Sequence, residues 1–263
     1  MCEPGEFTPV FHEATPLHAF IEFGNRTLTG VLGVIALVLA LVIWKDSRRP
    51  TWYRRLGLVP LLGVVLQAGI GGVTVLLHLH PAVVGVHMLV SLALVAASAA
   101  LLAARGPRPE GWVARPSVVS GAHVLLVLGL VLSVAGIVTT GSGPHSGDDE
   151  IAQRLMLDPV VVAKTHAWIV WAFVVVLLAI VWVLVRRAHA PRAVTSTWLV
   201  LLGVTLAQGL LGYVQYFTQL PAVLVGAHML GAALLVTALT WAYMDLRGFR
   251  APVAGGTSAS PAP

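Results

Sequence analysis

The chain is poor in charge and rich in apolar residues. Only 10% of its 263 residues are charged, whereas 57% are hydrophobic. Soluble domains average about a quarter charged residues, so this composition excludes an ordinary soluble domain and indicates an integral membrane protein. The net charge of +5 does not indicate nucleic-acid binding, because the basic residues lie in connectors between apolar segments.

Cysteine is almost absent. The single cysteine, Cys2, excludes a disulfide within this chain. Any partner of Cys2 is expected in a segment upstream of Met1.

Long apolar runs dominate what is there, and each is long enough to cross a bilayer as a helix. We therefore predict an all-α integral membrane protein. The expected spans cover residues 18–44, 57–77, 82–104, 117–139, 160–185, 195–216 and 222–245, followed by a disordered tail at 246–263.

The basic residues are strongly biased to one side of these spans. Only Arg26, Arg154 and Lys164 fall on the other side. The positive-inside rule therefore predicts a cytoplasmic C-terminus and, with seven spans, an N-terminus outside. The connectors assigned to the cytoplasm carry Lys45, Arg48, Arg49, Arg54, Arg55, Arg105, Arg108, Arg115, Arg186, Arg187, Arg192, Arg247 and Arg250.

The sequence repeats itself at an offset of 141 residues. Generic apolar similarity would not align rare polar residues, so we interpret the chain as two tandem helical-bundle units. We divide it into an N-terminal unit at 1–105 and a C-terminal four-helix unit at 117–245. The shift pairs Gln67 with Gln208, Gly71 with Gly212, Gly85 with Gly226, His87 with His228, Pro50 with Pro191, and Asn25 with His166.

The repeat leaves the span at 117–139 without a counterpart in the first half. We expect an eighth span upstream of Met1, because the sequence begins late or its start codon is misassigned. The alternative is a first unit that works with three helices.

Three histidines are expected at one depth inside the bundle. His87 and His228 lie a few residues after Pro81 and Pro221. His166 follows Asp158 and Pro159, which we expect to be an N-cap and the first helical position. Two imidazoles at one depth on two helices of a bundle are what axial coordination of a heme iron requires. The pair His166 and His228 is therefore a candidate heme site; interhelical hydrogen bonding is the alternative. A non-heme metal is disfavoured, because no carboxylate or cysteine joins the pair.

Glycines accompany the histidines in both halves. They would let a flat macrocycle approach the backbone, or they would serve close helix packing; the sequence leaves both readings open. The glycines concerned are Gly69, Gly71, Gly72, Gly209 and Gly212.

The two halves differ at one helix face. Glu22, Asn25 and Arg26 stand at helical spacing in the first half, whereas Ala163 occupies the position of Glu22 in the second. In the first half, His87 is the one firm candidate ligand of a heme iron, and Glu22 adds a carboxylate. An open coordination position with a carboxylate indicates a catalytic site, as opposed to an electron-transfer site. Arg26 could bind a heme propionate. The alternative is a local ion pair between Glu22 and Arg26.

These motifs together resemble the heme A synthase family in its actinobacterial form, over essentially all of residues 1–245. The loop at 138–148 is the most specific of them. The motifs are EFGNR at 22–26, QAGIGGVTVL at 67–76, VVGVHML at 83–89, VTTGSGPHSGD at 138–148, KTHA at 164–167 and VGAHML at 225–230.

The resemblance implies a membrane enzyme that oxidises the C8 methyl of heme O to the formyl group of heme A. It implies successive two-electron oxidations, with water supplying the oxygen and Glu22 acting at the methyl. His166 and His228 match ligands of a resident heme b, and His87 matches a ligand of the substrate heme. The family commonly has a second histidine where this chain has Asn25, so His18 or Asn25 is left as a weak second ligand.

The resemblance also implies location and partners. We expect the plasma membrane, heme sites near its outer face, and contacts with lipid, heme O synthase and cytochrome oxidase assembly proteins; a homo-oligomer is left open. The alternative functions are a b-type cytochrome acting only in electron transfer, or a transporter with a polar pathway.

Overall fold

A computed structural model of the chain describes residues 16–105, 112–146, 153–188 and 190–248. Within these ranges seven helices are long and apolar enough to cross a membrane, which confirms the predicted all-α integral membrane protein. The helices are α1 (Pro16–Lys45), α2 (Thr51–Leu56), α3 (Val59–Leu76), α4 (Pro81–Ala104), α5 (Pro116–Ser142), α6 (Pro159–Arg186), α7 (Arg192–Phe217) and α8 (Ala222–Arg247).

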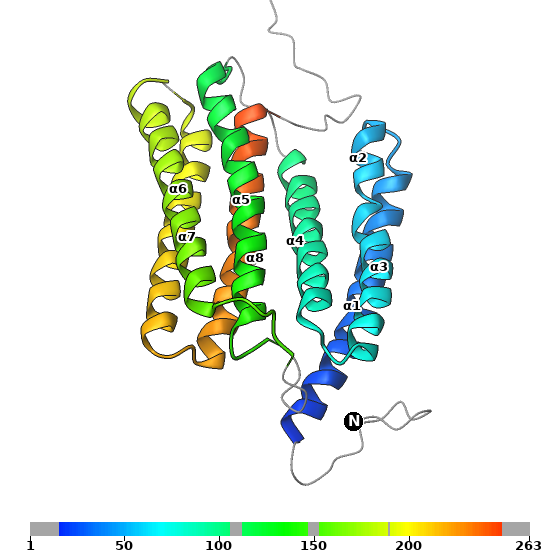
Figure 1. Cartoon of the computed structure of the whole chain (residues 1–263). Coiled ribbons are helices and arrows are strands. Elements are labelled where there is room, and N and C mark those ends of the chain that lie inside the picture. The colour runs from blue at the N-terminus through cyan, green and yellow to red at the C-terminus, as the bar shows by residue number, and fades with distance from the viewer. Residues whose placement is uncertain (1–15, 106–111, 147–152, 189, 249–263) are drawn as a thin grey trace, which may run out of the picture.

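The last four helices form a closed ring, in which α5 packs on α6, α6 on α7, α7 on α8 and α8 on α5 (Figure 1). The helices α6 and α8 therefore occupy one diagonal of this ring. In the first half, α3 packs between α1 and α4. The two halves meet where α4 packs against α8 and α5, so the helices that carry His87 and His228 are neighbours.

The larger apolar core fills the α5–α8 ring. Its fully buried members include Phe173 and Leu177 from α6, Trp198 and Leu201 from α7, and Leu125 from α5. A second cluster joins the first half to α8 at the opposite end of the bundle from the hairpins. It contains Ile43, Tyr53, Leu101, Ala103, Ala104 and Met244.

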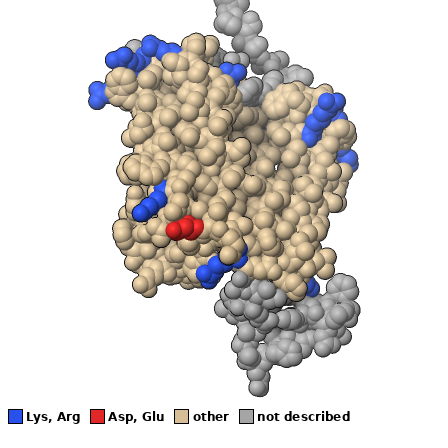
Figure 2. Space-filling model, in the orientation of Figure 1, with Lys and Arg blue, Asp and Glu red and all other residues tan. Residues whose placement is uncertain are grey.

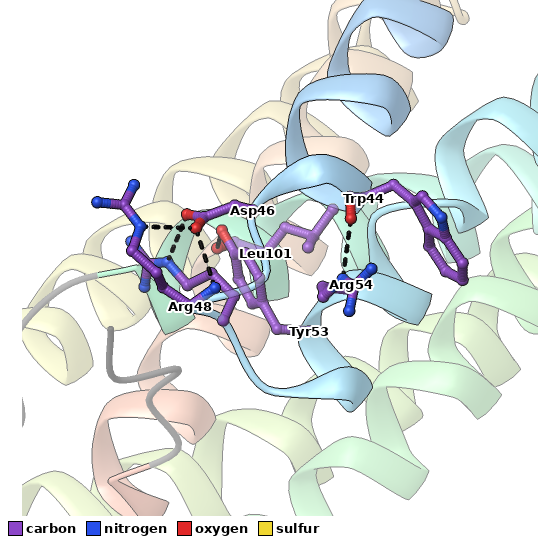
Figure 3. Close-up of polar contacts among 7 residues, drawn as sticks. Trp44, Asp46, Arg48, Tyr53, Arg54 and Leu101 are labelled. Carbon is purple, nitrogen blue, oxygen red and sulfur yellow. Dashed lines mark hydrogen bonds and ion pairs between the residues drawn. The ribbon is translucent and has the colours of Figure 1, made fainter. Parts of the chain in front are cut away.

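The connector after α1 holds a short helix that the sequence analysis did not predict. In α2, the Tyr53 hydroxyl donates to the Leu101 carbonyl at 3.3 Å, and Arg54 Nε donates to the Trp44 carbonyl at 2.9 Å (Figure 3). The Arg48 guanidinium beside Asp46 holds the pKa of that carboxyl below its usual range. Basic side chains also gather at this end of the molecule, and we call it the basic end (Figure 2).

The α3–α4 and α7–α8 hairpins, at the other end, share an unusual backbone. His78 and Leu79 have φ of 50° and 55°, and Gln219 and Leu220 have φ of 64° and 58°. The two pairs are separated by 141 residues in sequence, the offset of the repeat. Residues with a Cβ rarely adopt this conformation because it costs about 1–2 kcal/mol each.

Replacing Gln219 by glycine should relieve this cost, since glycine adopts positive φ readily. We expect Gln219→Gly to raise the free energy of unfolding by about 0.5–1 kcal/mol, measured by thermal unfolding in detergent. Thr218→Gly is the control, because Thr218 has φ of −94° and gains nothing from glycine. A Gln219→Gly variant less stable than Thr218→Gly would contradict this account of the hairpin.

Candidate functional site

Helix starts set the three central histidines at a common depth. The Asp158 carboxylate caps α6 by accepting from the amides of Val160 at 2.8 Å and Val161 at 3.3 Å, as the sequence predicts. His166, His228 and His87 follow the first residues of their helices by six or seven positions. At 1.5 Å per residue, each lies about 9–10 Å along its helix.

Each of these imidazoles lies against a glycine of a neighbouring helix. A Cβ atom placed on Gly136 of α5 would lie 3.2 Å from His166 Cε1, and one on Gly212 of α7 would lie 3.2 Å from His228 Cε1. The contact of Gly71 with His87 Cε1 is looser, at 3.6 Å. These glycines therefore make room for the imidazole rings.

The remaining glycines of the sequence prediction do not take part in these contacts. A Cβ atom on Gly69, Gly72 or Gly209 would meet no described atom within 4 Å. Their role beside a flat macrocycle stays a prediction.

The imidazole nitrogens are left without protein partners. Nδ1 of His87, His166 and His228 is enclosed and makes no hydrogen bond within the described part of the chain. His166 lies on α6 and His228 on α8, the two helices that occupy one diagonal of the ring. An enclosed Nδ1 leaves Nε2 as the ring nitrogen that can reach a ligand, so two such histidines at one depth on diagonal helices fit a heme held by two imidazoles.

A glutamine fixes the helix of each repeated histidine. Gln67 Nε2 donates to the His87 carbonyl at 3.0 Å and to Ser91 Oγ at 2.5 Å. Gln208 Nε2 donates to the His228 carbonyl at 2.6 Å. The amide of Gln208 lies against Gly231, where a Cβ atom would overlap it. The glutamines thus tie α3 to α4 and α7 to α8 at the level of the histidines.

The structure describes only some of the side chains that the sequence assigns to the first-half site. Glu22 and His18 lie in α1, but the side chains of residues 16–22 are outside the described part of the structure. The side chains of Asn25 and Arg26 are exposed on α1, and the Asn25 carbonyl accepts from Thr29 Oγ1 at 2.9 Å. Whether Glu22 and Asn25 approach His87 stays a prediction.

Three other described histidines have structural partners. His80 caps α4 by accepting from the Ala82 amide at 3.3 Å, and His123 Nε2 lies 3.0 Å from the Tyr243 hydroxyl. His145 Nε2 lies 2.7 Å from the Leu220 carbonyl, which ties the loop after α5 to the α7–α8 hairpin. Cys2, His12 and His189 are outside the described residues.

Sequence analysis missed two residues of the site. Gly136 lies on α5, which has no counterpart in the first half, so the repeat gave no signal for it. Gly231 lies three residues after His228. The repeat gave no signal for it, because the matching residue of the first half is Val90 and not a glycine. Only the packing of α7 on α8 identifies Gly231 as the space for Gln208.

Comparison with known proteins decides the family. Residues 8–240 match the COX15-CtaA family, described as cytochrome oxidase assembly protein. The chain belongs to this family. The heme A synthase of Rhizorhabdus wittichii is 26% identical over 250 residues, covering 85% of this chain and 70% of the relative. The heme A synthase of Geobacillus kaustophilus is 24% identical over 248 residues, covering 89% and 77%. No solved structure matches the chain.

The contact of Gly231 with Gln208 predicts a difference between two glycines of α8. Gly231→Ala should displace the Gln208 amide and break its bond to the His228 carbonyl, at a cost of about 0.5–1.5 kcal/mol. Gly226→Ala is the matched control, since no described atom lies within 4 Å of its Cβ position. We expect a lower unfolding midpoint for Gly231→Ala than for Gly226→Ala; equal midpoints would contradict the clamp.

Proposed function

We propose that this protein is a heme A synthase, which oxidises the C8 methyl of heme O to a formyl group. The observation that carries the proposal is the family match over residues 8–240, within which three histidines have enclosed Nδ1 atoms without protein partners. Both relatives named above are heme A synthases. The heme A formed would serve a terminal cytochrome oxidase.

We propose a resident heme b between α6 and α8, held by His166 and His228. Their helices stand diagonally in the ring, and their Nδ1 atoms are enclosed, so Nε2 of each would bind the iron. Such a group supplies one-electron redox chemistry when bound. The protein holds the rings in place through Gly136 and Gly212, and Gln208 fixes the backbone of the second ligand.

The substrate site is proposed in the first half. His87 would bind the iron of heme O, Arg26 a propionate, and Asn25 stands where the second half has His166. Glu22 would take a proton from the reacting methyl or stabilise positive charge that develops there. The second half has Ala163 at the position of Glu22, so only the first half carries this carboxylate.

The proposal includes an orientation. The basic end would face the cytoplasm, because basic connectors are retained there. The histidines lie toward the other end of their helices, so the heme sites would lie near the outer face of the plasma membrane. Heme O synthase and oxidase assembly proteins are the proposed partners.

Pigment analysis tests the function. In cells that supply heme O, the wild-type protein should form heme A, and Glu22→Gln should lower the yield at least about tenfold while the bound heme b remains. His166→Ala and His228→Ala should each abolish the low-spin heme b spectrum. The readouts are extracted heme composition and the absorption spectrum of the purified protein.

Other outcomes would contradict the proposal. Unchanged heme O in the presence of a bound low-spin heme b would favour the alternative, a b-type cytochrome that acts only in electron transfer. Heme A formation by Glu22→Gln at the wild-type rate would remove Glu22 from the chemistry.

The glycines beside the imidazoles predict a second set of spectra. Gly136→Ala and Gly212→Ala should each displace a ligand ring, because the added Cβ would lie 3.2 Å from Cε1, and should lower heme b content. Gly209→Ala and Gly203→Ala are the controls, as no described atom lies within 4 Å of either Cβ position. Normal heme content in all four variants would contradict the proposed ligand pair.

A further inference from the structure

An aromatic patch lies exposed on α6 and α7, in the half assigned to electron transfer. We define it as Trp168 and Trp171 of α6 with Tyr213, Tyr216 and Phe217 of α7. These side chains are between 46% and 76% exposed. Trp171 Nε1 donates to the Tyr213 hydroxyl at 3.2 Å and joins the two helices. Tyr213 and Phe217 stack with an interplanar angle of 16°, and Phe217 meets Tyr216 edge-on.

The matching positions of the first half carry no aromatic residue. At the repeat offset the five positions are Thr27, Gly30, Gly72, Val75 and Leu76. An aromatic belt formed only to anchor a bundle at the membrane interface should serve both halves alike. The patch is therefore a property of the half that carries His166 and His228.

The patch lies beside the proposed heme ligands. Trp171 is five residues after His166 on α6, and Tyr213 directly follows Gly212, whose backbone contacts the His228 ring. Electrons leaving this site would cross only α6 or α7 to reach the patch.

One polar atom of the patch lacks a partner. The Tyr213 hydroxyl oxygen accepts from Trp171, and its own hydrogen has no acceptor within the described part of the chain. In hydrocarbon an unpaired hydroxyl donor is costly. A ligand with a carbonyl oxygen would satisfy it.

Depth restricts what the ligand can be. Trp171 lies twelve residues inside α6, about 18 Å along the helix, within an apolar span. Tyr213 lies four residues before the end of α7, so the patch runs from this helix end into the apolar span. A water-soluble protein cannot reach Trp171. The ligand must be lipid-soluble, flat enough to stack on aromatic rings, and able to accept a hydrogen bond on a carbonyl.

We propose that the patch binds a membrane quinone, which is the electron acceptor of the reaction. The inference rests on the proposed function. Oxidation of the methyl to the alcohol with one water releases two electrons and two protons. The quinone takes up two electrons and two protons and leaves as the quinol, so each oxidation is balanced by one quinone.

Photolabelling with an azidoquinone tests the site in the full-length, heme-loaded protein in lipid nanodiscs. We expect labels on residues 168–171 and 213–217, competed by an unlabelled short-chain quinone. Tyr213→Phe, which removes only the hydroxyl, should weaken quinone binding by about three- to tenfold. Trp182→Phe is the control, because Trp182 is also exposed on α6 but lies beside Arg187 near the basic end.

Labelling elsewhere, or equal affinity for wild type and Tyr213→Phe, would overturn the quinone site. A patch that labels with azido-phospholipid but not with azidoquinone would be an ordinary interfacial belt, which also overturns it. The heme A assay separates this inference from the proposed function. Heme A formed with ferricyanide as acceptor, without quinone labelling, would leave the function intact; quinone labelling without heme A formation would leave only the site.

Discussion

The contact of an imidazole ring with a backbone that lacks a Cβ is the constraint on which the described site depends. Gly136 and Gly212 lie so close to His166 and His228 that a methyl group in either place would press on the ring. The close approach fixes both the spacing of the helices and the direction of the rings. The polar atoms then left without partners make the site suited to a ligand and unsuited to a packed apolar core.

Hydropathy and capping residues predicted the helices well, because spanning a bilayer needs long apolar runs and helix starts need few residue types. The structure lengthened most of the expected spans by one to three residues at an end; α8, for example, continues through Arg247. The span expected at 57–77 is shorter, because α3 covers only Val59–Leu76. The short helix α2 was missed, since its six residues are mostly polar and its contacts are tertiary. The positive φ values of Leu79 and Leu220 could not be predicted, because leucine rarely adopts this conformation and its presence in a sequence does not indicate it.

The candidate site was predicted in part. His87, His166 and His228 stood out because polar residues are rare in apolar spans and recur at the repeat offset. Gly136 did not stand out, since glycine is common in membrane helices and its function comes from the neighbour it meets. The glutamine clamps required knowledge of the facing helix. Sequence therefore indicated which groups the site contains, and packing indicated what holds them.

The bond between His145 and the Leu220 carbonyl has a mechanical consequence. Leu220 stands two residues before α8, and the Leu155 amide in turn bonds the Gly141 carbonyl at the end of α5, just ahead of α6. The loop after α5 thereby couples the starting points of α6 and α8. Sliding of one of these helices along its axis would strain the loop, so the loop keeps His166 and His228 level with each other.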